Sequence, residues 1–203
     1  MLKDATRCCG HSTDVRQLSP NIAQIVVLRD PVERFCSALQ YALDYWSSEP
    51  EVRRLIDLGL TDHNDMIDAF RDPQHQHHSA ICDEILNRHH RIGKRLLRYK
   101  WTYTLQHEWV HRPKYVLLFE KLDRELPMLC KALGLEPPTE IAHSNASRRQ
   151  KKTQLTVENK AFLKKLYAKD YALLAKYRQI PDNVRCTGIL MHDKNGQPTH
   201  LKN

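Results

Sequence analysis

The sequence predicts an α/β fold with a parallel sheet flanked by helices. Two short apolar runs, residues 22–28 and 115–119, have the length and composition of buried strands. The segments between and after these runs repeat apolar residues at helical spacing. Strands that alternate with helices are typical of parallel sheets whose faces are covered by helices. Two strands are few for a stable sheet.

The composition is that of one globular domain. The chain has 203 residues, of which 41% are hydrophobic and 28% are charged, and these shares exclude global disorder. No apolar run approaches the ~20 residues that a membrane span needs. Residues 1–9 lack the apolar core of a signal peptide. We expect one domain over residues 1–180 and a polar, irregular tail over residues 181–203.

The first predicted strand ends in Arg29-Asp30-Pro31, and a helix should follow it. Asp30 is a good N-cap, Pro31 suits the first helical position, and Glu33 completes a capping-box spacing. The apolar residues that recur at helical period are Val32, Phe35, Cys36, Leu39, Ala42, Leu43 and Trp46. We expect unpaired backbone N–H groups and the positive dipole end of this helix to face the carboxyl end of the strand, where ligands bind in open α/β sheets.

Apolar periodicity predicts four further helical segments, each with a glycine or a capping residue where a break or an end is expected. They are residues 49–72, broken near Gly59; much of 80–110, broken near Gly93; 126–133, ended by Gly134; and 156–177, begun by Thr156.

Arg29 and Ser37 are candidate anion-binding residues from their positions alone. Arg29 stands where the first strand stops, and a guanidinium group can bind a phosphate through two hydrogen bonds. Ser37 lies eight residues further on and shares a helix face with Glu33, so its hydroxyl can reach the same anion. The same residues also describe an ordinary, well-capped helix start, and both interpretations stay open at this point.

Residues 26–39 resemble the 3′-phosphate-binding signature of the sulfotransferases that use 3′-phosphoadenosine-5′-phosphosulfate (PAPS). In that family a strand ends in Arg-Asp-Pro or Arg-Asn-Pro, and an aromatic or aliphatic residue, an acid, Arg, two apolar residues and Ser follow. The stretch from Val26 to Leu39, Val-Val-Leu-Arg-Asp-Pro-Val-Glu-Arg-Phe-Cys-Ser-Ala-Leu, matches every position. Later stretches similar to the family, in its order, are residues 97–109, 114–122, 126–135, 147–158 and 171–177, so the resemblance spans roughly 10–178.

The resemblance implies a P-loop-like sulfotransferase fold, with PAPS as co-substrate and no metal. The reaction that it implies moves a sulfuryl group to a hydroxyl, or less commonly an amine, of a carbohydrate acceptor such as an anionic glycan. The implied site residues are Arg29 and Ser37 for the 3′-phosphate, Ser147, Arg148, Arg149 and Lys151 in a basic loop over the nucleotide, and His11 as the base that takes the acceptor's proton. Eukaryotic relatives act in the Golgi lumen behind a membrane anchor, whereas bacterial and viral ones need not and can be cytoplasmic.

The sequence departs from the family's pattern in one place. The family's 5′-phosphosulfate loop, a strand followed by a Pro-Lys-x-Gly-Thr/Ser turn, precedes the Arg-Asp-Pro motif. Nothing in residues 1–21 fits that loop, and no G-x-x-x-x-G-K-[ST] stretch occurs in the chain. We therefore expect a sulfotransferase domain that lacks its N-terminal quarter, including the central strand.

Two other functions fit parts of the sequence. The net charge of +8 favours anionic partners, so a non-catalytic polyanion- or nucleic-acid-binding module is one alternative. An inactive sulfotransferase remnant that still binds nucleotide is the other. The pair Arg29 and Ser37 favours the enzyme, because a general polyanion binder has no use for it, and we expect no nucleic-acid partner.

A histidine cluster raises a further alternative. His75, His77 and His78, with Cys82 and the pair His89-His90, have residue types that bind zinc. Without paired cysteine spacing such a cluster is more often a solvated loop, and we expect no metal site.

Overall fold

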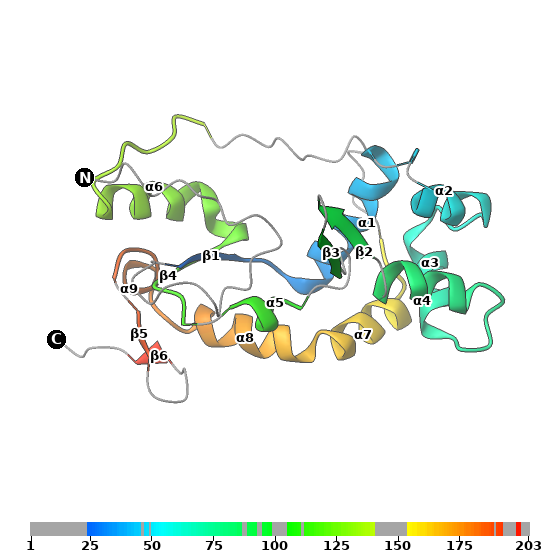
Figure 1. Ribbon diagram of the computed structural model, residues 1–203. Helices are drawn as coiled ribbons and strands as arrows, with labels where there is room; N and C mark the ends of the chain where they lie inside the picture. Colours follow the sequence, from blue (N-terminus) through cyan, green and yellow to red (C-terminus); the bar gives the residue numbers. More distant parts are fainter. Residues whose placement is uncertain are drawn as a thin grey trace.

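The computed structural model describes residues 24–45, 47–48, 50–86, 89–92, 95–98, 105–110, 112–140, 154–188, 190–192 and 198–199. In these ranges the chain is mostly helical and contains a small parallel sheet (Figure 1). The predicted α/β class is confirmed at this level. None of the helices in these ranges has both the length and the apolar character that crossing a membrane requires.

Strands β1 (Ile25–Leu28) and β4 (Tyr115–Leu118) form the parallel pair. They are the two apolar runs that the sequence predicts as strands. Ile25 lies opposite Tyr115 and Leu28 lies opposite Leu118, so the carboxyl ends of both strands meet at the same edge.

The side chains of β4 point alternately to the two faces of the sheet, and a helix covers each face. Val116 packs on the face covered by helix α8 (Ala168–Arg178), and Leu117 packs on the face covered by helix α6 (Leu122–Ala132). Figure 1 shows the two strands between α6 and α8. All four residues of β4 are buried as a result.

Strand β1 is buried on one face only. Leu28 packs with β4 and α8, but Ile25 and Val27 remain 48% and 45% exposed. Their register places them on the α6 side of the sheet, where α6 packs on β4. The expectation of a fully buried first strand is therefore wrong, because no described residue covers this face of β1.

Helix α1 (Pro31–Tyr45) begins as the sequence predicts. The Glu33 N–H donates to the Asp30 carboxylate at 3.0 Å, which is the expected N-cap contact. The buried face carries Val32, Phe35 and Leu39. These side chains join a core with residues of α2 (Pro50–Asp57), α3 (His63–Arg71), α4 (His78–Leu86) and α7 (Val157–Leu166).

Three further boundaries also agree with the sequence. Gly59, with φ of +77°, separates α2 from α3. Gly134, with φ of +68°, follows α6 in the left-handed region that favours glycine at helix ends. The Thr156 hydroxyl accepts the Asn159 N–H at 3.2 Å and caps α7. The last predicted helix is in fact two, because the chain breaks at Tyr167 between α7 and α8.

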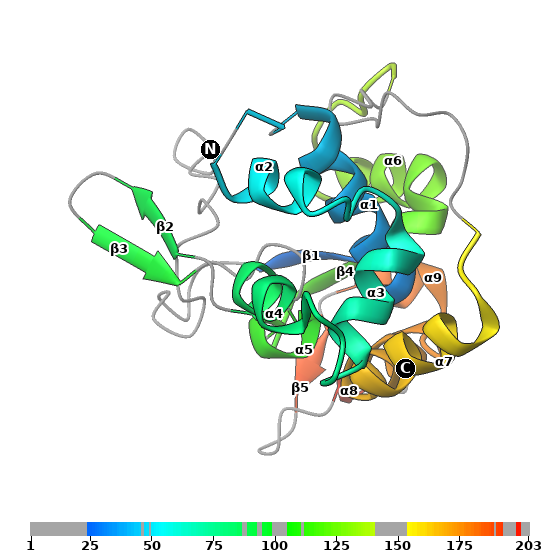
Figure 2. The ribbon, with the colours of Figure 1, turned by 90° about the vertical axis from the view of Figure 1, so that its right-hand side faces the viewer.

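The helix expected through much of residues 80–110 is wrong beyond Leu86. Strands β2 (His89–Ile92) and β3 (Arg95–Arg98) form an antiparallel hairpin that extends away from the helices (Figure 2). Helix α5 (Gln106–Trp109) follows after a gap in the described residues. Ile92 pairs with Arg95, so the connection has two residues, Gly93 and Lys94. A two-residue connection that contains glycine favours a hairpin over a helix break.

The expectation of an irregular tail after residue 180 is also wrong. Helix α9 (Asp182–Thr187) packs against α6 and β4. Strands β5 (Met191–His192) and β6 (Pro198–Thr199) pair with each other further along the chain. The Arg185 side chain, with 0% exposure, is completely buried. Its ion pairs, together with the buried Cys186 and the partly buried Val184, hold α9 in place. The helix is too short for an apolar repeat to predict it from the sequence.

Candidate functional site

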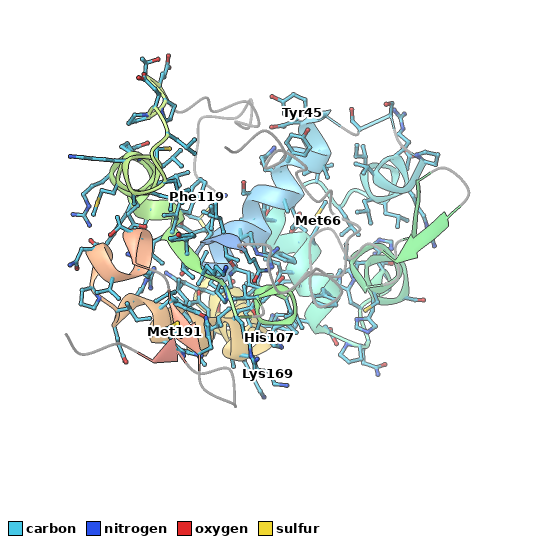
Figure 3. The ribbon with its side chains drawn as sticks, turned by 60° about the vertical axis from the view of Figure 1, so that its left-hand side comes forward. Tyr45, Met66, His107, Phe119, Lys169 and Met191 are labelled. Atoms are coloured by element: carbon cyan, nitrogen blue, oxygen red, sulfur yellow. The ribbon has the colours of Figure 1, made fainter. Side chains whose placement is uncertain are left out.

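Arg29 and Phe119 meet at the carboxyl edge of the parallel strands. Arg29 directly follows β1, and Phe119 directly follows β4 in the 3₁₀ helix η2 (Phe119–Lys121). The Arg29 Cζ lies 4.4 Å from the centre of the Phe119 ring, which is the geometry of a cation–π contact. Phe119 is 42% exposed, and Figure 3 shows it near the start of α1. The pair therefore stands where ligands bind in open α/β sheets.

The main chain of Arg29 is bound by the side chain of Gln106. The Arg29 N–H donates to Gln106 Oε1 at 3.0 Å, and Gln106 Nε2 donates to the Arg29 carbonyl at 2.8 Å. The side-chain amide thus takes both hydrogen-bonding groups of the first residue beyond the strand. Sequence reasoning missed this residue, because 77 positions separate the partners.

Asp170 in α8 fixes the start of α5 and thereby Gln106. Its carboxylate accepts the backbone N–H of Gln106 at 2.8 Å and that of His107 at 2.9 Å. The His107 ring lies 2.6 Å from the same carboxylate. Asp170 is fully buried, so these hydrogen bonds replace the contacts that its carboxylate would make with water. The sequence offered no local signal for it.

Asp30 is held by the residue next to Asp170. The Tyr171 hydroxyl donates to the Asp30 carboxylate, with oxygen–oxygen distances of 3.1 and 3.2 Å, and the Val32 N–H approaches the same hydroxyl. Burial, and then the charge of Asp30, raise the pKa of Tyr171. The dipeptide Asp170-Tyr171 therefore holds both residues of the turn after β1.

The N-terminus of α1 offers fewer unpaired backbone N–H groups than the sequence predicts. Pro31 has no N–H, the Glu33 N–H binds the Asp30 carboxylate, and the Arg34 N–H donates to the Asp30 carbonyl at 2.9 Å. The Asp30 carboxylate already complements the dipole of the helix. Side chains must therefore provide most of the contacts to an anion at this edge.

The guanidinium group of Arg29 has no ion pair among the described residues. Its Nε is buried and has no hydrogen-bond partner there. Burial lowers the pKa of Arg29; Arg34 also lowers it, while Glu33 and Asp30 act in the opposite direction. A partly buried cation without a partner, next to a second cation, favours binding of an anion. Arg34 is a contributor that sequence reasoning did not assign to the site.

Ser37 lies two turns along α1 from the Arg29 turn and is half-buried. It is on the side of the helix that Glu33 occupies, away from the core residue Phe35. Its hydroxyl makes no hydrogen bond within the described ranges, so it is available to a ligand. Of the predicted site residues, Arg29 and Ser37 are described, whereas His11, Ser147, Arg148, Arg149 and Lys151 lie outside the described residues.

Three cysteine and histidine side chains of the helical core, Cys36, His63 and His78, have structural environments. Burial raises the pKa of the Cys36 thiol to about 11, which makes it a poor nucleophile. His63 lies 2.9 Å from the Cys36 carbonyl through its Nε2, and His78 lies 3.0 Å from the Ala69 carbonyl through its Nδ1. The described residues contain no group of three or more His, Cys, Asp or Glu side chains that could hold a metal ion.

No protein-family model, no curated protein and no solved structure matches this chain.

Proposed function

We propose that the carboxyl edge of β1 and β4 binds the 3′-phosphate of PAPS, and that the chain acts as a sulfotransferase. The reaction transfers a sulfuryl group from PAPS to a hydroxyl, or less commonly an amine, of a carbohydrate acceptor. In this proposal Arg29 provides the charge, Ser37 provides a hydrogen bond, and the domain has the P-loop-like sulfotransferase fold that the sequence resembles.

The observation that carries the proposal is the unpaired guanidinium group of Arg29. The main chain of Arg29 is bound at two atoms, whereas its guanidinium group forms an ion pair with no carboxylate of the described residues. Holding a charge partly out of water without a partner is unfavourable unless a ligand supplies the opposite charge. A phosphate suits this position because guanidinium groups bind it through two charge-assisted hydrogen bonds.

The remaining parts of the proposal lie in segments whose role rests on the resemblance. His11 is the proposed base for the acceptor, and Ser147, Arg148, Arg149 and Lys151 are the proposed residues over the nucleotide. The net charge of +8 suits an anionic glycan as acceptor. If the chain belongs to a longer, anchored eukaryotic protein, the Golgi lumen is the proposed compartment, and otherwise the cytoplasm.

Nucleotide binding, rather than turnover, tests the proposal most directly, because residues 1–28 contain no Pro-Lys-x-Gly-Thr/Ser stretch. The experiment titrates 3′-phosphoadenosine 5′-phosphate and adenosine 5′-phosphate against the wild type and Arg29→Ala. We expect the wild type to prefer the first nucleotide. The loss of a charge-assisted contact costs about 1.5–3 kcal/mol, so Arg29→Ala should weaken this affinity about ten- to a hundredfold.

The controls separate the alternatives. Ser37→Ala should weaken the same affinity by a smaller factor, because it removes a neutral hydrogen bond worth about 0.5–1.5 kcal/mol. Arg71→Ala removes a surface arginine that pairs with Asp68, and it should leave the affinity unchanged. Equal affinities for both nucleotides in the wild type would overturn the proposal, and equally tight binding of other polyanions would favour the non-catalytic module. Binding with 3′-phosphate preference but no turnover by a longer chain would favour the inactive remnant.

A further inference from the structure

We propose that Gln106 and Asp170 are positioning residues, which hold Arg29 in the orientation that binds the 3′-phosphate. This inference rests on the proposed function. Neither side chain needs to touch the nucleotide, because both act through the main chain of Arg29.

Arg29, the first residue of the turn after β1, lies beyond the paired part of the sheet. The last paired residue of β1 is Leu28, opposite Leu118, so strand pairing does not fix the peptide groups of Arg29. Gln106 replaces it by accepting the N–H at 3.0 Å and donating to the carbonyl at 2.8 Å. Two hydrogen bonds to one residue restrict its backbone angles and therefore the direction in which its side chain leaves the strand.

Asp170 makes this support rigid. Gln106 is the first residue of a helix of only four residues, and such a short helix has little stability of its own. The fully buried Asp170 binds the first two N–H groups of α5, at 2.8 and 2.9 Å. The chain of contacts therefore runs from α8 through Asp170 and Gln106 to Arg29. Partners of this kind orient the residues that contact a ligand.

The chemistry of Gln106 also matters. An amide binds both backbone groups of Arg29 without a charge. A carboxylate at the same position could accept the N–H but could not donate to the carbonyl, and its negative charge would compete with the phosphate for Arg29. A neutral group thus leaves the cation available for an anion.

The experiment compares the ratio of the two dissociation constants, for adenosine 5′-phosphate and for 3′-phosphoadenosine 5′-phosphate, in four proteins. Gln106→Met has nearly the same side-chain length but no hydrogen bonds, and it should lower the ratio about three- to tenfold. Arg29→Ala should reduce the ratio to near one. Gln40→Met is the matched control: it removes the contact of Gln40 with Asp44 at 2.8 Å in α1 and should leave the ratio as in the wild type.

Two additional measurements keep the inference testable if Gln106→Met folds poorly. Asp170→Asn keeps the shape of the side chain and should lower the ratio in the same direction. The Arg29 amide should also exchange its hydrogen faster in Asp170→Asn than in the wild type, and this readout needs neither Gln106→Met nor nucleotide. If the contact between Gln106 and Arg29 has only a structural role, Gln106→Met should lower the free energy of unfolding but leave the ratio of dissociation constants unchanged.

The outcomes distinguish the two proposals. If the wild type shows no preference for the 3′-phosphate, the proposed function fails and the positioning role fails with it. If the wild type shows the preference and Arg29→Ala loses it, but Gln106→Met and Asp170→Asn keep the wild-type ratio, then only the positioning role is overturned.

Discussion

The carboxyl ends of β1 and β4 are held by similar contacts with different charges. At β4, the Glu125 carboxylate accepts the Leu118 N–H at 2.6 Å. At β1, the neutral amide of Gln106 takes the N–H and the carbonyl of Arg29. Each strand end thus receives a side chain that satisfies its backbone, but only at β4 is that side chain a carboxylate.

The arginine beside each strand end reflects this difference. Arg185 pairs with both oxygens of Glu125, at 2.9 and 2.6 Å, with Asp182 at 2.6 Å, and with the Val116 carbonyl at 2.9 Å. Arg29 has no carboxylate partner among the described residues. The comparison shows that one arginine has its charge neutralised within the fold, while the other is held in place with its charge unneutralised. This distinguishes an arginine that stabilises the structure from one that can bind an anion.

Removing Arg185 should have the largest effect on stability. Arg185→Met leaves the Glu125 carboxylate buried without its cation, and we expect the free energy of unfolding to fall by about 3–5 kcal/mol. Urea unfolding followed by circular dichroism measures the change. Arg178→Met is the control, since it removes an exposed pair with Glu120, which should cost at most about 1 kcal/mol. Similar losses in both variants would contradict the distinction between the two pairs.

The second largest effect should come from acid, which should lower the free energy of unfolding through the carboxylates at the β4 end. Burial would raise the pKa of Glu125, but the Arg185 guanidinium and the Leu118 N–H outweigh it, and the pKa lies below its ordinary value. The pKa of Asp182 is lowered too: burial opposes the shift, and Lys121 and Arg185 cause it. Both carboxylates therefore stabilise the fold above their unfolded-state pKa values of about 3.9–4.3, and this contribution is lost as the pH falls through their folded-state values.

Unfolding free energies measured between pH 7 and pH 3 test this expectation. The wild type should lose stability across the acid part of that range. Arg185→Met should lose less there, because no cation then lowers the pKa of Glu125. An identical acid dependence in both proteins would assign the loss to other carboxylates.

A smaller effect is expected at the β1 end from Tyr171→Phe. The substitution removes the hydrogen bond to Asp30, whose net value is about 0.5–1.5 kcal/mol. Thermal unfolding should show a correspondingly lower Tm. Tyr177→Phe in the same helix is the control and should be nearly neutral, because the Tyr177 hydroxyl makes no hydrogen bond within the described ranges. A larger loss in Tyr177→Phe would contradict this assignment.

The smallest effect on stability should come from Arg29→Met. The guanidinium group contributes no ion pair within the described part of the chain, and methionine keeps a favourable contact with the Phe119 ring. We expect the free energy of unfolding to stay within about 0.5 kcal/mol of the wild type. This is the usual range for substitutions that remove neither core packing nor a buried ion pair. The same variant should lose nucleotide affinity. A fall in stability as large as that of Arg185→Met would make Arg29 a structural residue.

The parts of the fold that the sequence predicts are those with local signals. The apolar run before Arg29 and the cap at Asp30 lie within ten residues of each other, and both agree with the structure. The glycines at positions 59 and 134 mark boundaries through their own backbone conformation. The β2–β3 hairpin was missed because its apolar spacing also fits a helix, and only its short connection favours the turn.

Local signals also account for the part of the candidate site that the sequence proposes. Arg29 and Ser37 stand in one local motif, and the structure puts both at the carboxyl end of β1 or in the helix that follows. Gln106 and Asp170 could not be predicted, because they reach Arg29 through contacts across 77 and 64 positions of the chain. Such contacts depend on how α5 and α8 pack, which no local pattern specifies.

The contacts of α8 with the β1 turn and with the strands also restrict the spacing of residues within this helix. Asp170 and Tyr171 bind the turn, while Leu174 and Tyr177 pack beneath the strands. One inserted residue between these pairs would rotate one relative to the other by about 100°. Insertions and deletions in related chains should therefore be absent from this stretch and accumulate in exposed segments such as residues 134–140.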